Sequence, residues 1–378
     1  MAIDAVRRRV TLGLLSAGLL PMRVCAAVSG GQLLPRERNS EGWPDLLSAW
    51  QAASTYQVGV WGADQRVRGV QLPLRPHQVL WDPVQPDSAV AIARRPGDYI
   101  ARFDMRSLTL PQLNEAEPER VFEGHAAFSA DGRVLFTSET DVITGQGLVG
   151  VRDSASLAKL DEFPTHGIGP HALLVERSGA VLIANGGILT LPETGRTKLN
   201  LDQMDASLVR LSSRTGRLLG QWRLPDPRLS IRHLARARDS SIGIALQAQH
   251  DDLEQRRNAP IFAHFNGDQI RIGEMPANLS LGGYAGDITC VSEPGVAHFA
   301  VSCARAGVVG CWDDSLRWCG RVPIQGVCGL THSQGDIIAT SEIGEIVRFA
   351  PARLDAARRI QTSVLWDNHL AVRASSLM

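Results

Sequence analysis

Short apolar runs separated by turn residues fill most of the chain. After His125, for example, Ala130-Asp131-Gly132 divides two runs in which apolar and polar positions alternate. An alternation with a period of two predicts half-buried β-strands rather than helices. Six such strand–turn–strand segments follow one another at intervals of 41 to 62 residues, and they start near His77, His125, His171, His233, Asp287 and Cys328.

Repeated units of about 40–50 residues with four strands each are typical of β-propeller blades. Residues 56–75 and the tail around Trp366–His369 supply strands for a seventh blade. A blade shared by the two ends of the chain closes the ring and leaves no free sheet edge. We therefore expect an all-β fold, a single seven-bladed β-propeller over residues 50–378, with a two-domain β-sandwich protein as the alternative.

The first 27 residues have the layout of an export signal. Arg7, Arg8 and Arg9 precede thirteen mostly apolar residues, Val10 to Met22, and small residues follow up to Ala27. This run is shorter than the roughly 20 residues that a membrane-spanning helix needs. The pattern predicts a signal peptide over 1–27, in which the arginines suit a twin-arginine signal, and a linker over 28–49. It also predicts a periplasmic protein without a transmembrane span in the mature chain.

Composition and motifs exclude several classes of function. Lys+Arg and Asp+Glu are equal at 39 each, and no basic cluster stands out after residue 27, which argues against a nucleic-acid partner. The sequence has no nucleophile elbow, zinc-protease motif or phosphate-binding loop. Five cysteines lie within forty residues, and in an oxidising compartment they are compatible either with one or two disulfides or with free buried thiols. They are Cys290, Cys303, Cys311, Cys319 and Cys328.

The histidines are the most informative candidates for chemistry. Five of the ten stand where the chain enters the first strand of a blade, and they are His77, His125, His171, His233 and His369. That strand is innermost in a propeller, so we expect the five side chains to converge on the central channel. Neutral imidazole is a common metal ligand, and we expect copper or iron here. Binding should weaken as pH falls through about 6.5, the ordinary pKa of histidine. The alternative is that each ring only forms hydrogen bonds with a neighbouring turn.

Further polar residues are expected at the same mouth of the channel, where they would contact a ligand. These candidates are Arg75, Arg232, Asn185, Asn368, Gln247 and Tyr284. An arginine can hold an anionic ligand through two parallel hydrogen bonds, or it can brace adjacent blades through a carboxylate. The sequence leaves both roles open for Arg75 and Arg232.

An ordered series of motifs resembles a known bacterial family. The series includes Arg94-Arg95-Pro96-Gly97, Gly167-Ile168-Gly169-Pro170-His171, Ala184-Asn185-Gly186-Gly187-Ile188, Ser230-Ile231-Arg232-His233-Leu234 and Trp366-Asp367-Asn368-His369. Over essentially the whole mature chain it is similar to the domain of unknown function 1513 family. The resemblance implies an exported propeller, often encoded beside imelysin-like and di-haem proteins in iron-responsive operons. The chain has Leu189-Thr190-Leu191-Pro192 where the family tends to have Thr-His-Pro, so a histidine expected there is missing.

Three functions remain open at this stage. The first is a binding or accessory protein that holds a metal ion or a metal-related ligand at the histidine-lined mouth and serves iron acquisition. It would work with a periplasmic iron-uptake partner of the imelysin-like or di-haem type. The second is a metal-assisted hydrolase of the lactonase kind, since propellers host such sites in the same channel. The third is a scaffold for protein interactions.

Overall fold

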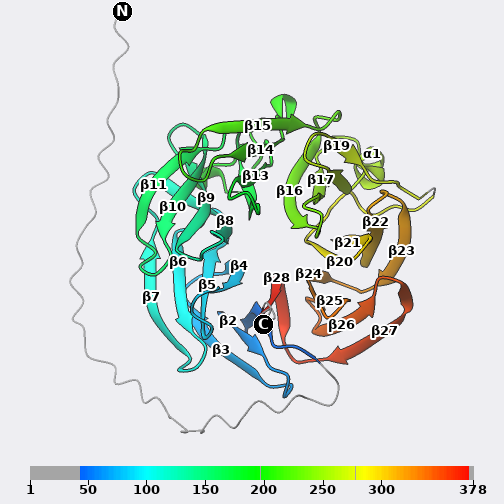
Figure 1. The fold of residues 1–378 in the computed structure, drawn as a ribbon, viewed down its shortest axis with the longest axis horizontal. Helices are drawn as coiled ribbons and strands as arrows, with labels where there is room; N and C mark the ends of the chain where they lie inside the picture. The colour runs from blue at the N-terminus through cyan, green and yellow to red at the C-terminus, as the bar shows by residue number, and fades with distance from the viewer. Residues whose placement is uncertain (1–42, 196, 277, 374–378) are drawn as a thin grey trace, which may run out of the picture. The chain divides into compact units, whose positions relative to one another are not determined.

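Seven four-stranded antiparallel sheets form a closed ring around one axis (Figure 1). This computed structural model describes residues 43–373, apart from 196 and 277. The expected signal peptide and most of the expected linker lie outside the described residues. The prediction of a seven-bladed propeller whose terminal strands share a blade is confirmed.

The blades follow the chain in order. Blade 1 consists of β28 (Leu365–Val372), β1 (Leu46–Ala52), β2 (Thr55–Trp61) and β3 (Val67–Leu72). Blade 2 consists of β4 (Pro76–Trp81), β5 (Ser88–Ala93), β6 (Tyr99–Asp104) and β7 (Thr109–Glu115). Blade 3 consists of β8 (Arg120–Phe128), β9 (Val134–Asp141), β10 (Gly147–Asp153) and β11 (Lys159–Pro164). Blade 4 consists of β12 (Pro170–Val175), β13 (Val181–Asn185), β14 (Ser207–Leu211) and β15 (Leu218–Arg223).

The remaining three blades complete the ring. Blade 5 consists of β16 (Leu229–Arg236), β17 (Ile242–Ala248), β18 (Phe262–Phe265) and β19 (Ile270–Ile272). Blade 6 consists of β20 (Ile288–Glu293), β21 (Val296–Cys303), β22 (Val308–Asp313) and β23 (Trp318–Pro323). Blade 7 consists of β24 (Val327–Ser333), β25 (Asp336–Ser341), β26 (Glu345–Ala350) and β27 (Arg353–Gln361).

Helices are few and short. They are α1 (Leu253–Asn258) and the 3₁₀ turns η1 (Pro192–Thr194) and η2 (Leu201–Gln203), and all three lie in connections between strands. Asp252 caps α1, because its carboxylate accepts a hydrogen bond from the Gln255 N–H. None of the helices in the described part of the chain has the length and apolar character that crossing a membrane requires.

Blade 1 joins the two ends of the propeller. The innermost strand, β28, pairs antiparallel with β1, with Leu46 opposite Val372 and Trp50 opposite Trp366. β1 begins at Leu46, ahead of the expected boundary at residue 50, and residues 46–50 are buried. The closing strand therefore comes from the C-terminal end, and its partner comes from the N-terminal end of the described chain.

Apolar side chains fill the spaces between blades. The described residues form seven hydrophobic clusters, and each combines residues from two neighbouring blades. The cluster between blades 7 and 1 holds Trp43, Trp50 and Trp366, and it packs β28 against the ring.

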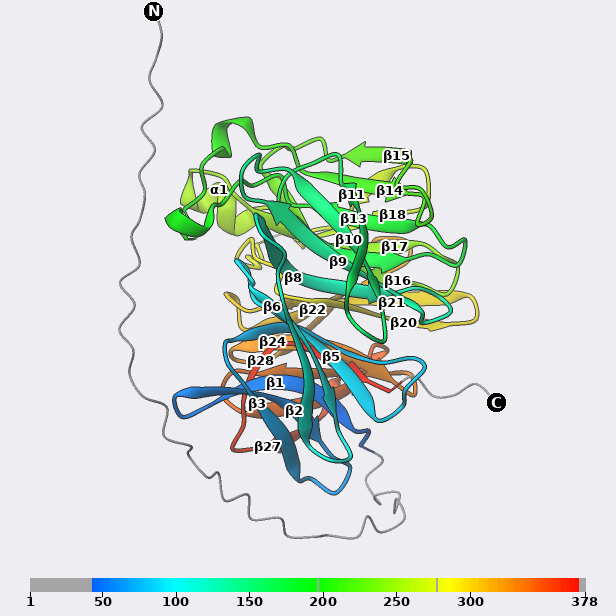
Figure 2. The same ribbon diagram turned by 90° about the vertical axis from the view of Figure 1, so that its left-hand side faces the viewer.

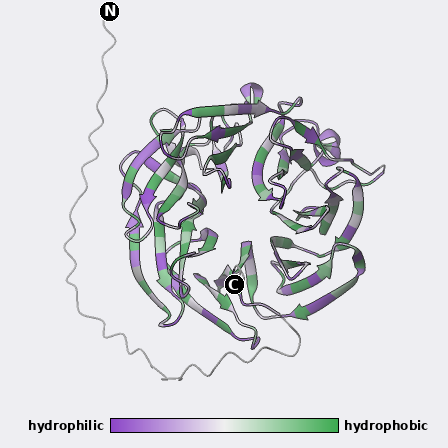
Figure 3. Ribbon diagram, in the orientation of Figure 1, coloured by the Kyte–Doolittle hydropathy of each residue, from purple (hydrophilic) through white to green (hydrophobic). Residues whose placement is uncertain are grey.

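Figure 3 shows hydrophobic residues along the strands, with more hydrophilic residues toward the outer strands and connections. Figure 2 gives the side view, in which the innermost strands cross the middle of the molecule.

Candidate metal centre

Irregularities in the innermost strands direct five histidines toward the axis. In each of β4, β8, β12, β16 and β28, the pairing with the neighbouring strand shifts at or beside the histidine. A bulge of this kind inserts extra residues on one strand and re-aims the side chains there. The five histidines are His77, His125, His171, His233 and His369, and the predicted convergence of their side chains is what the structure shows.

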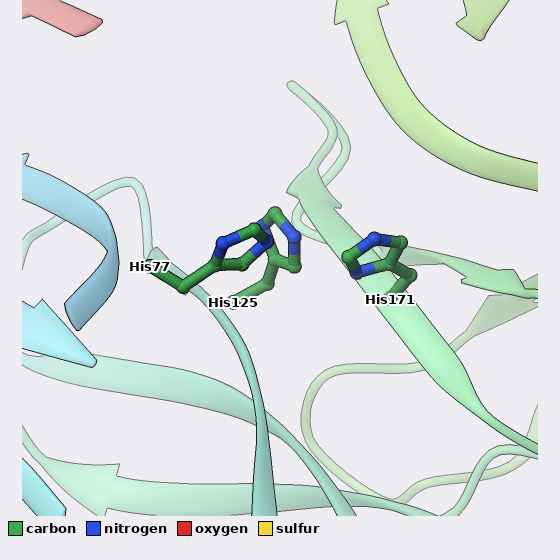
Figure 4. A group of neighbouring side chains, drawn as sticks. All are labelled: His77, His125 and His171. Carbon is green, nitrogen blue, oxygen red and sulfur yellow. The ribbon is translucent and has the colours of Figure 1, made fainter. Parts of the chain in front are cut away.

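The five imidazole rings touch one another at the axis. The ring centroids of His125 and His171 are 4.3 Å apart, and those of His77 and His369 are 4.7 Å apart. His233 completes the group at 4.7 Å from His171 and 4.9 Å from His369. Figure 4 shows the His77 and His125 rings next to each other with the His171 ring facing them. We call these five residues the histidine cluster.

Nitrogens of the histidine cluster are grouped as metal ligands are. One trio is His77, His125 and His171, the other is His125, His233 and His369, and within each trio the ligand atoms lie within 4.8 Å of one another. Two imidazole nitrogens bound to one zinc-sized ion at about 2.0–2.1 Å can be at most about 4.2 Å apart. The limit of 4.8 Å within each trio is close to this value. His125 belongs to both trios.

Several of these nitrogens are buried and have no hydrogen-bond partner among the described residues. They are both ring nitrogens of His125, Nδ1 of His171 and Nε2 of His369. Exposure of the five residues is between 1% and 7%. A buried polar atom without a hydrogen bond costs about 1–3 kcal/mol. The alternative in which every histidine is satisfied by a neighbouring turn therefore does not describe His125, His171 or His369.

Burial also keeps four of the five rings uncharged. Desolvation, followed by repulsion from the other histidines, holds the pKa of His77, His125 and His171 well below the ordinary value of 6.5. The same causes lower the pKa of His233 to about 3. Neutral rings keep a lone pair for a metal ion. The expectation that proton competition sets in near pH 6.5 is wrong for these four rings, because burial shifts their protonation to lower pH.

The backbone of the cluster carries two unusual features. Gly124, which precedes His125, has φ +96°, and a Cβ there would lie 2.6 Å from Cδ2 of His77. Only glycine lets β8 and the His77 ring come so close. His369 itself has φ +62°, a conformation that is costly for a residue with a side chain. Strain of this kind is concentrated at functional sites.

The other predicted ligand residues have different surroundings. The Arg75 Nε and Nη2 atoms each lie 2.6 Å from an oxygen of Asp367. Of the two roles left open for Arg75, this contact is the bracing of adjacent blades through a carboxylate. Asn185 is fully buried, and its amide donates to the Thr165 carbonyl and to Ser207 Oγ. These contacts give Arg75 and Asn185 structural roles. The Asn368 amide lies 3.4 Å from Nδ1 of His77, which places Asn368 at the border of the cluster.

Gln247, Tyr284 and Arg232 are the remaining predicted ligand residues. The Gln247 side-chain amide donates to the Ala285 carbonyl, and the Gln247 backbone forms an isolated antiparallel β-bridge with Tyr284. The Arg305 guanidinium covers the Tyr284 ring, 4.5 Å from its centroid. Arg232 is only 2% exposed, and burial, together with repulsion from Arg95, lowers the pKa of its guanidinium to about 9. The Arg232 Nε atom is buried and has no hydrogen-bond partner.

Two acidic residues near the cluster were not among the candidates. Asp287 Oδ1 lies 3.2 Å from Nδ1 of His369, and its two oxygens also accept hydrogen bonds from the N–H groups of Ile288 and Leu330. Glu123 is buried beside Arg95, at 3.6 Å. Asp287 occupies the blade-start position that histidine takes in other blades. This equivalent position is the sequence feature that could have identified Asp287 as a site residue. Glu123 gives no such signal, because its importance depends on a partner in another blade.

Within the described part of the chain, the five cysteines between 290 and 328 are free thiols, and no disulfide joins any two of them. Cys290, Cys303 and Cys311 are buried, whereas Cys319 is exposed. Burial raises the pKa of Cys290 to about 11 and that of Cys303 to about 12. Cys290 and Cys303 act as small apolar residues in the cluster between blades 5 and 6, and Cys311 does so in the cluster between blades 6 and 7.

Comparison with known proteins places the chain in a family. Among solved structures, it is similar to "Dihydro-heme d1 dehydrogenase NirN in complex with DHE", with a TM-score of 0.56 and 12% identity, over 85% of this chain and 64% of that one. The chain therefore spans less than two thirds of the NirN chain, and the likeness extends to the propeller fold. A search of curated proteins gave no significant match. Residues 70–373 match the family described as "Protein of unknown function (DUF1513)", and the chain belongs to this family.

Proposed function

We propose that this propeller binds a transition-metal ion in the histidine cluster. The observation that carries the proposal is the contact of five buried imidazole rings, whose nearest centroids are 4.3–5.7 Å apart. Such a group leaves polar nitrogens unsatisfied in a desolvated place, and a bound ion would satisfy them. A donor set made of imidazoles suits copper, iron or zinc rather than magnesium or calcium.

The chemistry of the donors favours copper in a binding role, and the family resemblance adds iron as a candidate. Across first-row divalent metals, affinity for nitrogen sites rises from iron to copper. The ligand atoms of each trio lie within 4.8 Å of one another, a separation suited to a single ion. A lactonase-like site, the second candidate at the sequence level, is expected to have an inner ring rich in carboxylates. In the described chain the only carboxylate within 4 Å of a ring of the cluster is Asp287.

Location and partners are part of the same proposal. The arginine-rich start and apolar run favour export to the periplasm, and the family resemblance favours a link to iron acquisition. A binding or accessory protein would hold the ion for an imelysin-like or di-haem partner. Binding in the periplasm makes copper and iron the metals to test first.

The test is a metal titration of the purified full-length protein after chelator treatment. Cu(I), Cu(II), Fe(II) and Zn(II) are added separately, and the bound metal and the melting temperature are measured. A site that binds only the native state raises stability by an amount that grows with the logarithm of metal concentration over Kd. We expect a saturable increase for at least one of the first three ions.

Replacement of His171 and His233 together by Ala removes a ligand from each trio and should abolish the metal response. The β-sheet circular dichroism should stay unchanged. His298, on β21 and outside the cluster, gives the matched control H298A, which should keep the response. If the wild type binds none of these ions, the proposal is wrong.

A further inference from the structure

We infer that a small oxyanion of the carboxylate, carbonate or phosphate type binds to the Arg232 guanidinium beside the histidine cluster. This anion site is separate from the metal proposal, since it rests on different side chains. Among residues 43–373, no carboxylate lies within 4 Å of Arg232, and Arg232 is 2% exposed. A buried arginine normally has an anionic or hydrogen-bonding partner, because an unpaired buried charge is costly.

The surroundings place the Arg232 guanidinium on the inner side of the ring. It lies against Gly186 of blade 4, where a Cβ would be 3.1 Å from both Cζ and Nη1. Its electrostatic surroundings include Arg95 of blade 2, Glu123 of blade 3 and Tyr284 of the β19–β20 connection, whereas Arg232 itself is part of blade 5. Arg232 stands on β16, the innermost strand of blade 5, and its guanidinium lies beside Gly186 of blade 4, so it lies on the inner side of the ring. The absence of a side chain at Gly186 is what allows this backbone to pack so closely against the guanidinium.

Positive charge exceeds negative charge around this position. Arg95 and Lys198 both interact with Arg232, and Lys198 comes from the long β13–β14 connection. The acidic residue that interacts with Arg232 is Glu123, which already accepts a hydrogen bond from Thr140 and pairs with Arg95 at 3.6 Å. Desolvation, followed by repulsion from Arg232, lowers the pKa of Lys198 to about 8. An added anion would relieve this repulsion.

The arginine fork sets the class of ligand. A guanidinium presents parallel N–H donors that match two oxygens of a carboxylate, carbonate or phosphate, whereas a spherical chloride ion cannot use both. The Nε atom of Arg232, which has no protein partner, is one of these donors. The ligand would thus be either an inorganic oxyanion or a carboxylate of an organic molecule, held by the same contacts.

The test measures anion binding to the full-length, metal-free protein, so that its outcome does not depend on the metal proposal. Acetate, bicarbonate and phosphate are titrated calorimetrically against chloride at equal ionic strength and pH. We expect saturable binding of at least one oxyanion and no saturation with chloride. Binding of acetate alone would indicate an organic carboxylate, and binding of bicarbonate or phosphate alone would indicate an inorganic anion.

Two variants connect the binding to Arg232. R232Q keeps the size but removes the charge and should weaken binding by about tenfold or more. G186A keeps every charge but places a methyl group against the guanidinium, and it should weaken binding as well. R223Q changes an exposed arginine that pairs with Asp205 and should bind as the wild type does.

The inference fails if no oxyanion binds saturably to the wild type. It also fails if a folded R232Q protein binds as tightly as the wild type. Should R232Q not fold, R232K and G186A decide the matter, because unchanged affinity in both would rule out recognition by the guanidinium fork.

Discussion

Nδ1 of His369 lies 3.2 Å from Oδ1 of Asp287, although the two residues are in blades 1 and 6. An N–H on Nδ1 directed at this carboxylate leaves Nε2, which has no protein partner, with its lone pair free. Burial alone would raise the pKa of Asp287, but attraction to His369 and the hydrogen bond from its ring hold that pKa below the usual value. Carboxylates behind metal-ligating histidines have this orienting effect.

Replacement of Asp287 by Asn should weaken metal binding by about 10–100-fold, the usual effect of losing such a partner. The amide keeps the size of the side chain but not the negative charge that orients the His369 ring. Competition titration with a chelating dye would measure the change in Kd. Asp313, an acidic residue of blade 6 that pairs with Arg317, offers the control D313N. Equal affinity of D287N and the wild type would show that Asp287 only supports the backbone.

His125 should be the most sensitive ligand position, because it is the residue shared by both trios. Replacement of His125 by Ala should eliminate metal binding, whereas H77A and H369A each leave one trio complete. Bound metal per chain can be measured by atomic absorption after gel filtration. Equal loss in all three variants would mean that the five rings act as one indivisible site.

Stability of the metal-free protein should fall with decreasing pH below about 6.5. The unfolded chain binds protons at its histidines there, whereas burial keeps His77, His125, His171 and His233 unprotonated in the folded state. Each such ring lowers the free energy of unfolding by up to about 1.4 kcal/mol per pH unit. The stabilising contribution is thus present above pH 6.5 and is lost on acidification. Urea unfolding at several pH values would measure it.

The double variant H171A/H233A serves as the comparison for this pH dependence. Two of the four rings are then absent, so the slope of stability against pH should be smaller. Identical slopes in the variant and the wild type would show that the rings take up protons without unfolding the protein.

Deletion of residues 365–378 should prevent stable folding. The deletion removes β28, exposes the edge of β1 and uncovers the apolar cluster between blades 7 and 1. A milder change, Trp366→Ala, should cost about 3–5 kcal/mol, because Trp366 is 2% exposed. Light scattering and thermal unfolding would report both effects. A truncated chain with the full melting temperature would disprove the shared blade.

Cys319 should react with an alkylating reagent much faster than its neighbours. It is exposed, whereas burial raises the pKa of Cys303 and of Cys328 to about 12, which leaves almost no reactive thiolate. Mass spectrometry of the native and the denatured protein would count the modified sites. Fast modification of Cys303 in the native protein would contradict its buried position.

The local pattern was sufficient to predict the propeller and its innermost strands. Alternation and turn residues are properties of neighbouring positions, so the segments starting at His77 and His171 could be placed in blades from the sequence. β1 escaped this pattern, because Leu46–Trp50 is buried throughout and shows no alternation. A strand covered on both faces is mostly apolar, here with only the buried Ser48 as a polar residue, and a search for a period of two does not reveal it.

The site was only partly predictable. The repeated position of the histidines indicated their convergence, since equivalent strands surround one axis. Arg75 pairs with Asp367, a residue hundreds of positions away in the sequence. The Nε atom of Arg232 has no hydrogen-bond partner among the described residues, and no sequence pattern indicates this. Such relations follow from the closed ring and not from the spacing of residues within one blade.

The position of His369 on β28 has a consequence for biosynthesis. β28 is the last strand of the propeller to leave the ribosome, and it is also the strand that closes the ring. Until it docks, neither the trio with His233 nor the Asp287 contact exists. A complete set of ligands can therefore form only in a chain whose synthesis has passed the last blade, so that unfinished or open chains would compete poorly for the metal.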